Sequence, residues 1–167
     1  MKGVILTLFM GWLLSGCGDP GTGPVDVHWD RDSCERCRMI LSDRKHAAQV
    51  RYDDAGKRSR VRMFDDIGCA MIWLEDKPWR DTPSTEVWTV DHRNGEWIDA
   101  RSAYYIKGQL TPMEYQIGAQ SQPPISKSLS YAEAKLHVFK VEATYNQHGA
   151  ELHENLLKAQ KEGRDSE

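Results

Sequence analysis

Two cysteines and a methionine lie close together near the start of the chain, spaced as Cys34-x-x-Cys37-x-Met39. Cysteines three residues apart can turn both sulfurs toward one point, where they close a small disulfide or bind one metal ion. The thioether of Met39 adds a third sulfur, and a set of thiolates and thioethers favours Cu(I) over zinc or magnesium. This spacing therefore predicts a soft-metal site, with a redox-active or structural cysteine pair as the alternatives.

Other known uses of such a pair fit the surrounding sequence less well. A c-type haem site needs a histidine directly after the second cysteine, and position 38 is arginine. A thioredoxin-like redox site opens a helix after a strand, whereas this pair precedes the first expected strand. A structural zinc site needs about four ligands, and no second cysteine pair or histidine pair follows. A thiol–disulfide lipoprotein without a metal role and a plain structural disulfide stay open.

Further sulfur and nitrogen donors are spread along the chain. Met113 follows Pro112 in an expected loop, which makes it a candidate ligand delivered from the second half of the sequence. His46 lies close in sequence to the cysteine pair, and Cys69 lies in an expected helix, where a lone cysteine is more often a buried small hydrophobe. The predicted metal ligands are Cys34, Cys37, Met39 and Met113, with His46 and Cys69 as possible additions.

The first 16 residues have the pattern of a secretory signal peptide. Lys2 is followed by an apolar stretch over residues 3–14, which is shorter than the roughly 20 residues that a helix needs to cross a bilayer. The exit, Leu14-Ser15-Gly16-Cys17, resembles a lipobox. The pattern predicts a lipid on Cys17 that anchors the domain on the periplasmic side of a bacterial membrane, and Gly18 favours the outer membrane.

Composition limits the remaining functions. The chain has 22 Lys and Arg against 25 Asp and Glu, a net charge of −3, and a mean hydropathy of −0.64. An acidic chain does not suit nucleic-acid binding, which requires a basic face. No GxSxG, HExxH or phosphate-loop motif is present in the sequence. We therefore predict a non-enzymatic protein that binds no nucleic acid.

The elements that must position these donors follow from periodicity and turn signals. Residues 48–52 and 61–63 alternate as a strand hairpin, and a helix with Asp65 as its N-cap should follow and end by Pro78. Strands at 87–90 and 97–99 flank the turn signal Asn94-Gly95. The second half repeats this order, with strands at 103–106 and 115–119 and a helix from Ser130 to about residue 146.

The predicted fold class is therefore α+β, with two successive ββαβ-like units. The first spans residues 47–100 and the second residues 101–167, including a C-terminal tail. The signal peptide covers residues 1–16, and residues 17–46 hold the lipid anchor, a tether and the cysteine pair. Glycines and prolines over residues 18–24 predict that this tether is flexible.

In this order, the segments resemble the NosL family, the copper-binding lipoproteins that serve maturation of nitrous oxide reductase. The resemblance runs through Cys17, Cys34-x-x-Cys37-x-Met39-Ile40, Phe64-Asp65-Asp66-Ile67-Gly68-Cys69, Trp97-Ile98-Asp99-Ala100, Ala103-Tyr104-Tyr105 and Pro112-Met113, whereas residues 125–167 match poorly. Two residues depart from the family pattern, because Arg38 and Glu114 stand where glycine is expected. Glycine at such positions often serves a positive φ.

The resemblance implies a periplasmic chaperone that binds Cu(I) and delivers it for the copper–sulfide centre of nitrous oxide reductase, or to another periplasmic copper acceptor. It also implies sulfur and histidine ligands, which by position points to Cys34 or Cys37 with Met39 and Met113. A homodimer is a further expectation, since an exposed copper–thiolate site can be shared between two copies.

Overall fold

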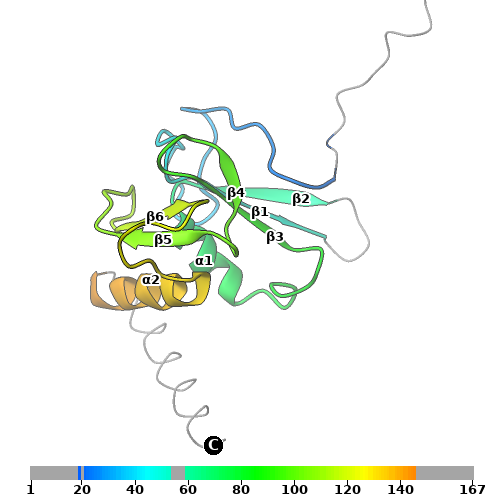
Figure 1. The fold of residues 1–167 in the computed structure, drawn as a ribbon. Coiled ribbons are helices and arrows are strands. Elements are labelled where there is room, and N and C mark those ends of the chain that lie inside the picture. Colours follow the sequence, from blue (N-terminus) through cyan, green and yellow to red (C-terminus); the bar gives the residue numbers. More distant parts are fainter. Residues whose placement is uncertain (1–18, 20, 54–58, 146–167) are drawn as a thin grey trace, which may run out of the picture.

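The computed structural model describes Asp19, residues 21–53 and residues 59–145. These residues form a four-stranded antiparallel sheet, a two-stranded antiparallel sheet and two helices (Figure 1). The α+β class expected from the sequence is confirmed. The expected signal peptide, Cys17 and the end of the second unit lie outside the described residues.

The elements follow one another as ββαββ and then ββα. The first group comprises β1 (Ala48–Tyr52), β2 (Arg60–Phe64), α1 (Ile67–Glu75), β3 (Glu86–Val90) and β4 (Trp97–Asp99). The second group comprises β5 (Tyr104–Lys107), β6 (Ile117–Gln120) and α2 (Tyr131–Tyr145). The strands and helices of the described part thus lie within a few residues of their expected positions.

Helix α1 covers one face of the larger sheet, whose strand order is β2-β1-β3-β4. The ring of Trp73 on α1 lies 5.4 Å from that of Phe64 and 6.0 Å from that of Tyr52. Trp79, which follows the helix, stacks on Tyr52 with a centroid distance of 4.0 Å. These aromatic contacts fix α1 against β1 and β2, and so fix where the start of α1 lies.

The opposite face of this sheet is covered by the N-terminal segment, which we define as Asp19 and residues 21–25. Gln49 exchanges two hydrogen bonds with the main chain of Val25, at 2.9 and 2.8 Å. Arg51 donates to the carbonyl of Gly23 at 2.8 Å and to the two carboxylate oxygens of Asp19 at 2.9 and 2.8 Å. The polar side chains of β1 are therefore buried, although their alternation with apolar residues is typical of a half-exposed strand.

The same contacts correct the expectation of a flexible tether. Glu86 of β3 accepts hydrogen bonds from the Thr22 hydroxyl at 2.5 Å and from the Gly23 amide at 2.7 Å. Together with Arg51, Glu86 holds the N-terminal segment on the sheet from Asp19 onward. Glycine and proline exclude helix and strand here, but the segment is bound by side chains that come from distant strands.

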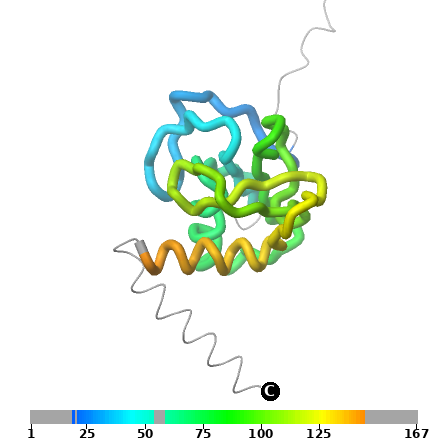
Figure 2. Tube along the Cα trace, turned by 60° about the vertical axis from the view of Figure 1, so that its left-hand side comes forward, coloured from blue at the N-terminus to red at the C-terminus, as the bar shows by residue number. Residues whose placement is uncertain are grey.

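Helix α2 packs against α1 and β5 and runs along one side of the molecule (Figure 2). Its start at Ser130 is confirmed by a capping box, in which Ser130 Oγ accepts from the Glu133 amide at 3.3 Å and Glu133 accepts from the Ser130 amide at 2.8 Å. Within the described residues, no helix is long and apolar enough to span a membrane.

Asp91, directly after β3, links the larger sheet to the β5–β6 hairpin. It is fully buried and accepts hydrogen bonds from the amide and hydroxyl of Ser121, both at 2.9 Å. Its other partner is the Arg93 guanidinium, with Nε at 2.9 Å and Nη2 at 2.6 Å. Arg93 and Ser121 hold the pKa of Asp91 well below its usual range, so the carboxylate stays charged and fastens the two sheets.

Candidate metal centre

The cysteine pair lies in a tight turn before β1. The Cys34 amide donates to the carbonyl of Met39 at 2.8 Å, and the Arg38 amide donates to the carbonyl of Cys34 at 3.1 Å. The Glu35 amide donates to the carbonyl of Met63 at 2.8 Å, which fastens the turn to β2. These bonds hold the turn beside the C-terminal end of β2, close to the start of α1.

The start of α1 supplies the other donors. Asp66 is the N-cap and accepts from the Gly68 amide at 2.8 Å, so the expected cap at Asp65 is wrong by one residue. Asp65 is thereby free of the capping role, and the Cys37 thiol donates to its carboxylate oxygens, both at 3.3 Å. Cys69 lies in the first turn of the helix, where the helix dipole favours negative charge.

Four side chains together form what we call the donor group, namely Cys34, Cys37, Asp65 and Cys69. One donor atom from each lies within 4.8 Å of all the others. Sulfurs held 2.3 Å from a tetrahedral ion lie about 3.8 Å apart, so an inward shift of about 1 Å suffices to surround an ion. Cys34 and Cys69 are fully buried and Asp65 is 2% exposed, whereas Cys37 is only half-buried. The group can hold a metal ion that enters past Cys37.

The thiols of the donor group are hydrogen-bonded to one another. The bond from Cys69 lowers the pKa of Cys34 to about 7, although burial of Cys34 opposes this shift. Hydrogen bonds to Cys34 and Cys37, together with burial, raise the pKa of Cys69 above its usual range. A metal binds thiolates, so the lowered pKa of Cys34 favours binding, and the proton of Cys69 must leave for that sulfur to become a ligand.

A half-buried cation, Arg36, lies beside this group of acidic donors. Arg36 places Nη1 4.0 Å from the sulfur of Cys69 and 3.1 Å from the hydroxyl of Tyr115. Its Nη2 pairs at 2.5 Å with Glu142 of α2, and Glu142 also accepts from Tyr115 at 2.6 Å. Three thiolates and a carboxylate would concentrate negative charge here, and the guanidinium offsets part of it.

Close packing at Gly68 holds this network against α1. A Cβ at position 68 would lie 2.2 Å from the Tyr115 ring, so only glycine lets the ring rest on the first turn of the helix. Tyr115 is fully buried and is fixed through its hydroxyl. The residue before Cys69 thus sets how closely α1 approaches the Arg36 network.

The methionines and the histidine predicted as ligands have different surroundings. Met39 is 47% exposed at the end of the cysteine turn. Met113 is half-buried, and its amide donates to Asp66 at 3.3 Å, so its loop meets the start of α1. The ligand roles of Met39 and Met113 stay predictions. His46 is outside the donor group, and its Nδ1 lies 2.9 Å from Asp43, while its buried Nε2 has no hydrogen-bond partner among the described residues.

The two positions where the NosL resemblance expects glycine both have a left-handed backbone. Arg38 has a φ of 67° and Glu114 has a φ of 57°. Only glycine adopts this region without steric cost. The departures therefore change the side chain at these positions while the backbone keeps the conformation that suits glycine.

One donor, Asp65, was absent from the predicted ligands. The sequence signal that could have revealed it is the pair Asp65-Asp66 before a helix, because one aspartate is enough for the cap and the other is left for another role. Cys69 was considered only as an additional ligand, and the structure places its sulfur among the donors. Asp65 and Cys69 reach the centre because α1 packs against the cysteine turn. Such a tertiary contact cannot be predicted from the spacing of residues along the sequence.

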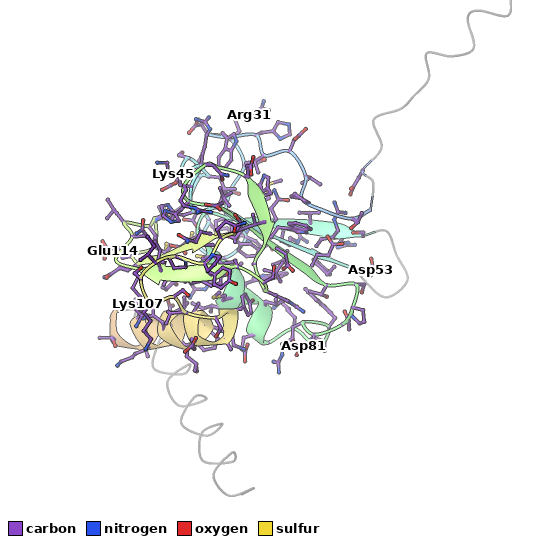
Figure 3. The ribbon with its side chains drawn as sticks, viewed as in Figure 1. Arg31, Lys45, Asp53, Asp81, Lys107 and Glu114 are labelled. Carbon is purple, nitrogen blue, oxygen red and sulfur yellow. The ribbon has the colours of Figure 1, made fainter. Side chains whose placement is uncertain are left out.

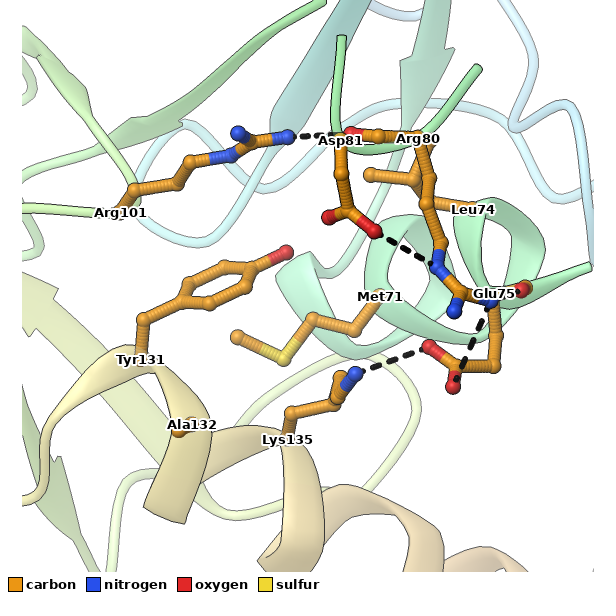
Figure 4. A pocket seen from close by; sticks show the side chains of 9 residues that line it. All are labelled: Met71, Leu74, Glu75, Arg80, Asp81, Arg101, Tyr131, Ala132 and Lys135. Atoms are coloured by element: carbon orange, nitrogen blue, oxygen red, sulfur yellow. Dashed lines mark hydrogen bonds and ion pairs between the residues drawn. The ribbon is translucent and has the colours of Figure 1, made fainter. Parts of the chain in front are cut away.

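A cleft of about 250 Å³ between α1 and α2 shares no residue with the donor group (Figure 4). Its charged side chains pair within the cleft, since Arg80 bonds to Asp81 at 3.0 Å and Lys135 to Glu75 at 2.9 Å. Arg101 donates to the carbonyl of Arg80 at 2.6 Å. The donor group is therefore the stronger candidate for a functional site.

No family model matches this chain. Comparison with curated protein sequences also finds no match. Its function is therefore inferred from the residues of the centre and from their geometry.

Proposed function

We propose that this protein is a lipid-anchored Cu(I) chaperone that carries the ion on Cys34, Cys37 and Cys69. The observation that supports this most strongly is the convergence of three thiols within 4.8 Å, from a turn and a helix that are distant in sequence. Thiolates are the protein ligands that Cu(I) prefers, and they select it over harder ions. The lipid on Cys17 would keep the carrier at the membrane surface.

The unequal burial of the thiols suits a carrier. Cys34 and Cys69 are fully buried and hold the ion, whereas Cys37 forms the edge that an acceptor can reach. Met39, two residues after Cys37 and 47% exposed, is the proposed entry ligand. Ligands can then be exchanged one at a time, beginning at Cys37. A completely closed site would release its ion slowly.

The NosL resemblance supports nitrous oxide reductase as the acceptor. Its two local departures, Arg38 and Glu114, lie at positions with positive φ, so the glycine pattern of the family and the backbone of this chain agree. The proposed cargo is Cu(I) for the copper–sulfide centre. The proposed reaction is ligand exchange, in which only metal–ligand bonds are broken and made.

Zinc is the rival ion, and one observation favours it. Asp65 adds a carboxylate oxygen to the three sulfurs, and a tetrahedral set of four protein ligands is typical of structural zinc sites. In that reading the ion fastens the cysteine turn to α1 and is not delivered. In the copper reading Asp65 is not a ligand, and it accepts from the Cys37 thiol only until the ion binds.

A thiol–disulfide role has less support from the geometry. Exchange requires an accessible attacking thiolate, and two of the three thiols are fully buried. The third, Cys37, donates a hydrogen bond from its thiol to the carboxylate of Asp65. Oxidation of a dithiol substrate by the disulfide form of the protein, which is thereby reduced, would restore this reading.

The decisive experiment is an anaerobic Cu(I) titration of the domain with Cys17→Ser, in competition with a chromogenic Cu(I) chelator. Cys69→Ser and the Cys34→Ser/Cys37→Ser pair should each lower the affinity by more than the 10–100-fold that outer-shell changes typically cause. His46→Gln is the matched control, since His46 lies outside the donor group, and should leave the affinity unchanged.

Asp65→Asn separates the two metals. The copper reading predicts that this variant keeps its Cu(I) affinity, whereas the zinc reading predicts that it loses most of its Zn(II) affinity. Failure of the reduced parent domain to compete for Cu(I) would refute the chaperone. Transfer of bound copper to the metal-free reductase is the readout for the proposed acceptor.

A further inference from the structure

Asp19, at the start of the N-terminal segment, and the metal centre lie toward opposite ends of the β1–β2 hairpin. Tyr52 pairs with Arg60 at one end, and Ala48 pairs with Phe64 at the other. Asp65 of the donor group directly follows Phe64. Arg51, which binds Asp19, lies across from Val61, so about four residues of strand, or about 13 Å, separate it from Asp65.

Several contacts fix the place where the chain enters the domain. Asp19 is bound by Arg51, and Thr22 and Gly23 are bound by Glu86, which lies beside Arg51 in the sheet. Figure 3 agrees with this placement of the entry point. In it Asp53, just after β1, and Glu114, just after Met113, lie on opposite sides of the molecule. The entry point is therefore remote from the metal centre.

The covalent distance from the lipid to this entry point is short. Cys17 precedes Asp19 by two residues, so their Cα atoms are at most about 7 Å apart. A domain of this size has a radius of gyration of about 14 Å. If residues 18–24 were free they would span about 15 Å and would let the domain turn. With Asp19 held by Arg51, the link is too short for the domain to roll over.

We propose that the bilayer surface is a fixed docking partner of the Arg51 end of the larger sheet, so that the metal centre faces away from the membrane. This inference rests on the proposed lipidation of Cys17. Trp79, half-buried and stacked on Tyr52 at this end, is of the residue type enriched at membrane–water interfaces.

The orientation narrows the class of acceptor. A centre that points away from the bilayer is presented to a soluble protein, whereas a transporter embedded in the same membrane meets the Arg51 end. The orientation thus supports a soluble copper acceptor such as the reductase, and it disfavours direct loading of a membrane-embedded partner.

The experiment uses the full lipoprotein, with its acylation confirmed by intact mass, in nanodiscs that contain lipids with paramagnetic headgroups. Amide relaxation at Tyr52 and Arg60 should exceed that at Asp65 and Cys69 by at least about tenfold, since Arg60 is five residues of strand, or about 17 Å, from Asp65. The control variant carries a flexible Gly–Ser insert of about 15 residues between Gly18 and Asp19. This insert keeps the Asp19–Arg51 pair but frees the domain, and the difference should disappear.

The possible results separate this inference from the proposed function. Uniform relaxation in the acylated parent, or stronger relaxation at Asp65 and Cys69, would overturn the orientation while leaving the anchor in place. A mass without acyl chains would overturn both the anchor and the orientation. The copper titration of the soluble domain tests metal binding, and its outcome does not depend on either of these two results.

Discussion

Replacing Arg38 with glycine should make the protein more stable. Its φ of 67° lies in the left-handed region, which costs a residue with a Cβ about 1–2 kcal/mol. Glycine gives back about 0.5–1 kcal/mol through its greater freedom in the unfolded chain, so the net gain should be about 0.5–1 kcal/mol. The arginine side chain offsets little of this, since its ion pair with Glu35 spans 3.8 Å at the surface.

Thermal unfolding of the reduced, metal-free domain measures the effect. A gain of this size should raise the melting temperature by about 2 °C in a protein of about 150 residues. Arg38→Ala is the matched control, because it removes the same side chain but keeps the Cβ, and it should bring no gain. If the glycine variant is no more stable than the alanine variant, the left-handed backbone at this position is not strained and the reasoning fails. Glu114 should behave in the same way.

Three further variants test the packing and the charges around the centre. Gly68→Ala should destabilise the domain by about 1–3 kcal/mol in a thermal melt, because its Cβ would meet the Tyr115 ring; a neutral result would show that the ring moves aside freely. The folded protein holds the pKa of Asp91 below its ordinary value of 3.8, so the stability from this group is complete above about pH 4 and declines as the pH falls further. Asp91→Asn should lose that stability at neutral pH and unfold with a flatter acid dependence in denaturant titrations, and an acid profile like the parent's would count against the assignment. Glu142→Gln should lower the free energy of unfolding by up to about 3 kcal/mol and also weaken Cu(I) binding, because it leaves the charge of the half-buried Arg36 without its carboxylate partner; unaltered copper affinity would exclude a role for that charge at the centre.

The secondary structure could be predicted because each element has a local signature. The alternation over residues 48–52 gave β1, and Ser130 followed by Glu133 gave the start of α2. The Asn94-Gly95 turn is present, with a φ of 82° at Gly95. These signals come from residues only a few positions apart, because turns, helix caps and strand alternation are set by interactions between near neighbours in the sequence.

The metal centre could be predicted only in part. The spacing of Cys34 and Cys37 indicated a shared point for two sulfurs, and the structure places both in one donor group. Cys69 and Asp65 join them because α1 begins against the cysteine turn, which is a tertiary contact. The sequence does not reveal which of the two successive aspartates caps the helix. In the structure Asp66 is the cap.

The N-terminal segment shows what composition cannot predict. Glycine and proline indicate the absence of helix and strand, and a linker was the natural interpretation. A bound segment and a free one can share that composition, since the difference lies in their partners. The deciding partner here is Arg51, which lies 32 residues from Asp19 and is buried, although the alternation along β1 predicts an exposed side chain.

The contact between Arg36 and Glu142 joins two parts of the chain that are synthesised far apart in time. A chain leaves the ribosome or a translocase with its N-terminus first, so Arg36 and its neighbouring cysteines emerge early. Cys69 follows Arg36 after 33 residues, and Glu142 follows it after 106 residues. A partly emerged chain thus carries thiols before α2 arrives to hold the guanidinium beside them. The network around the donor group is therefore complete only after residue 142 has emerged.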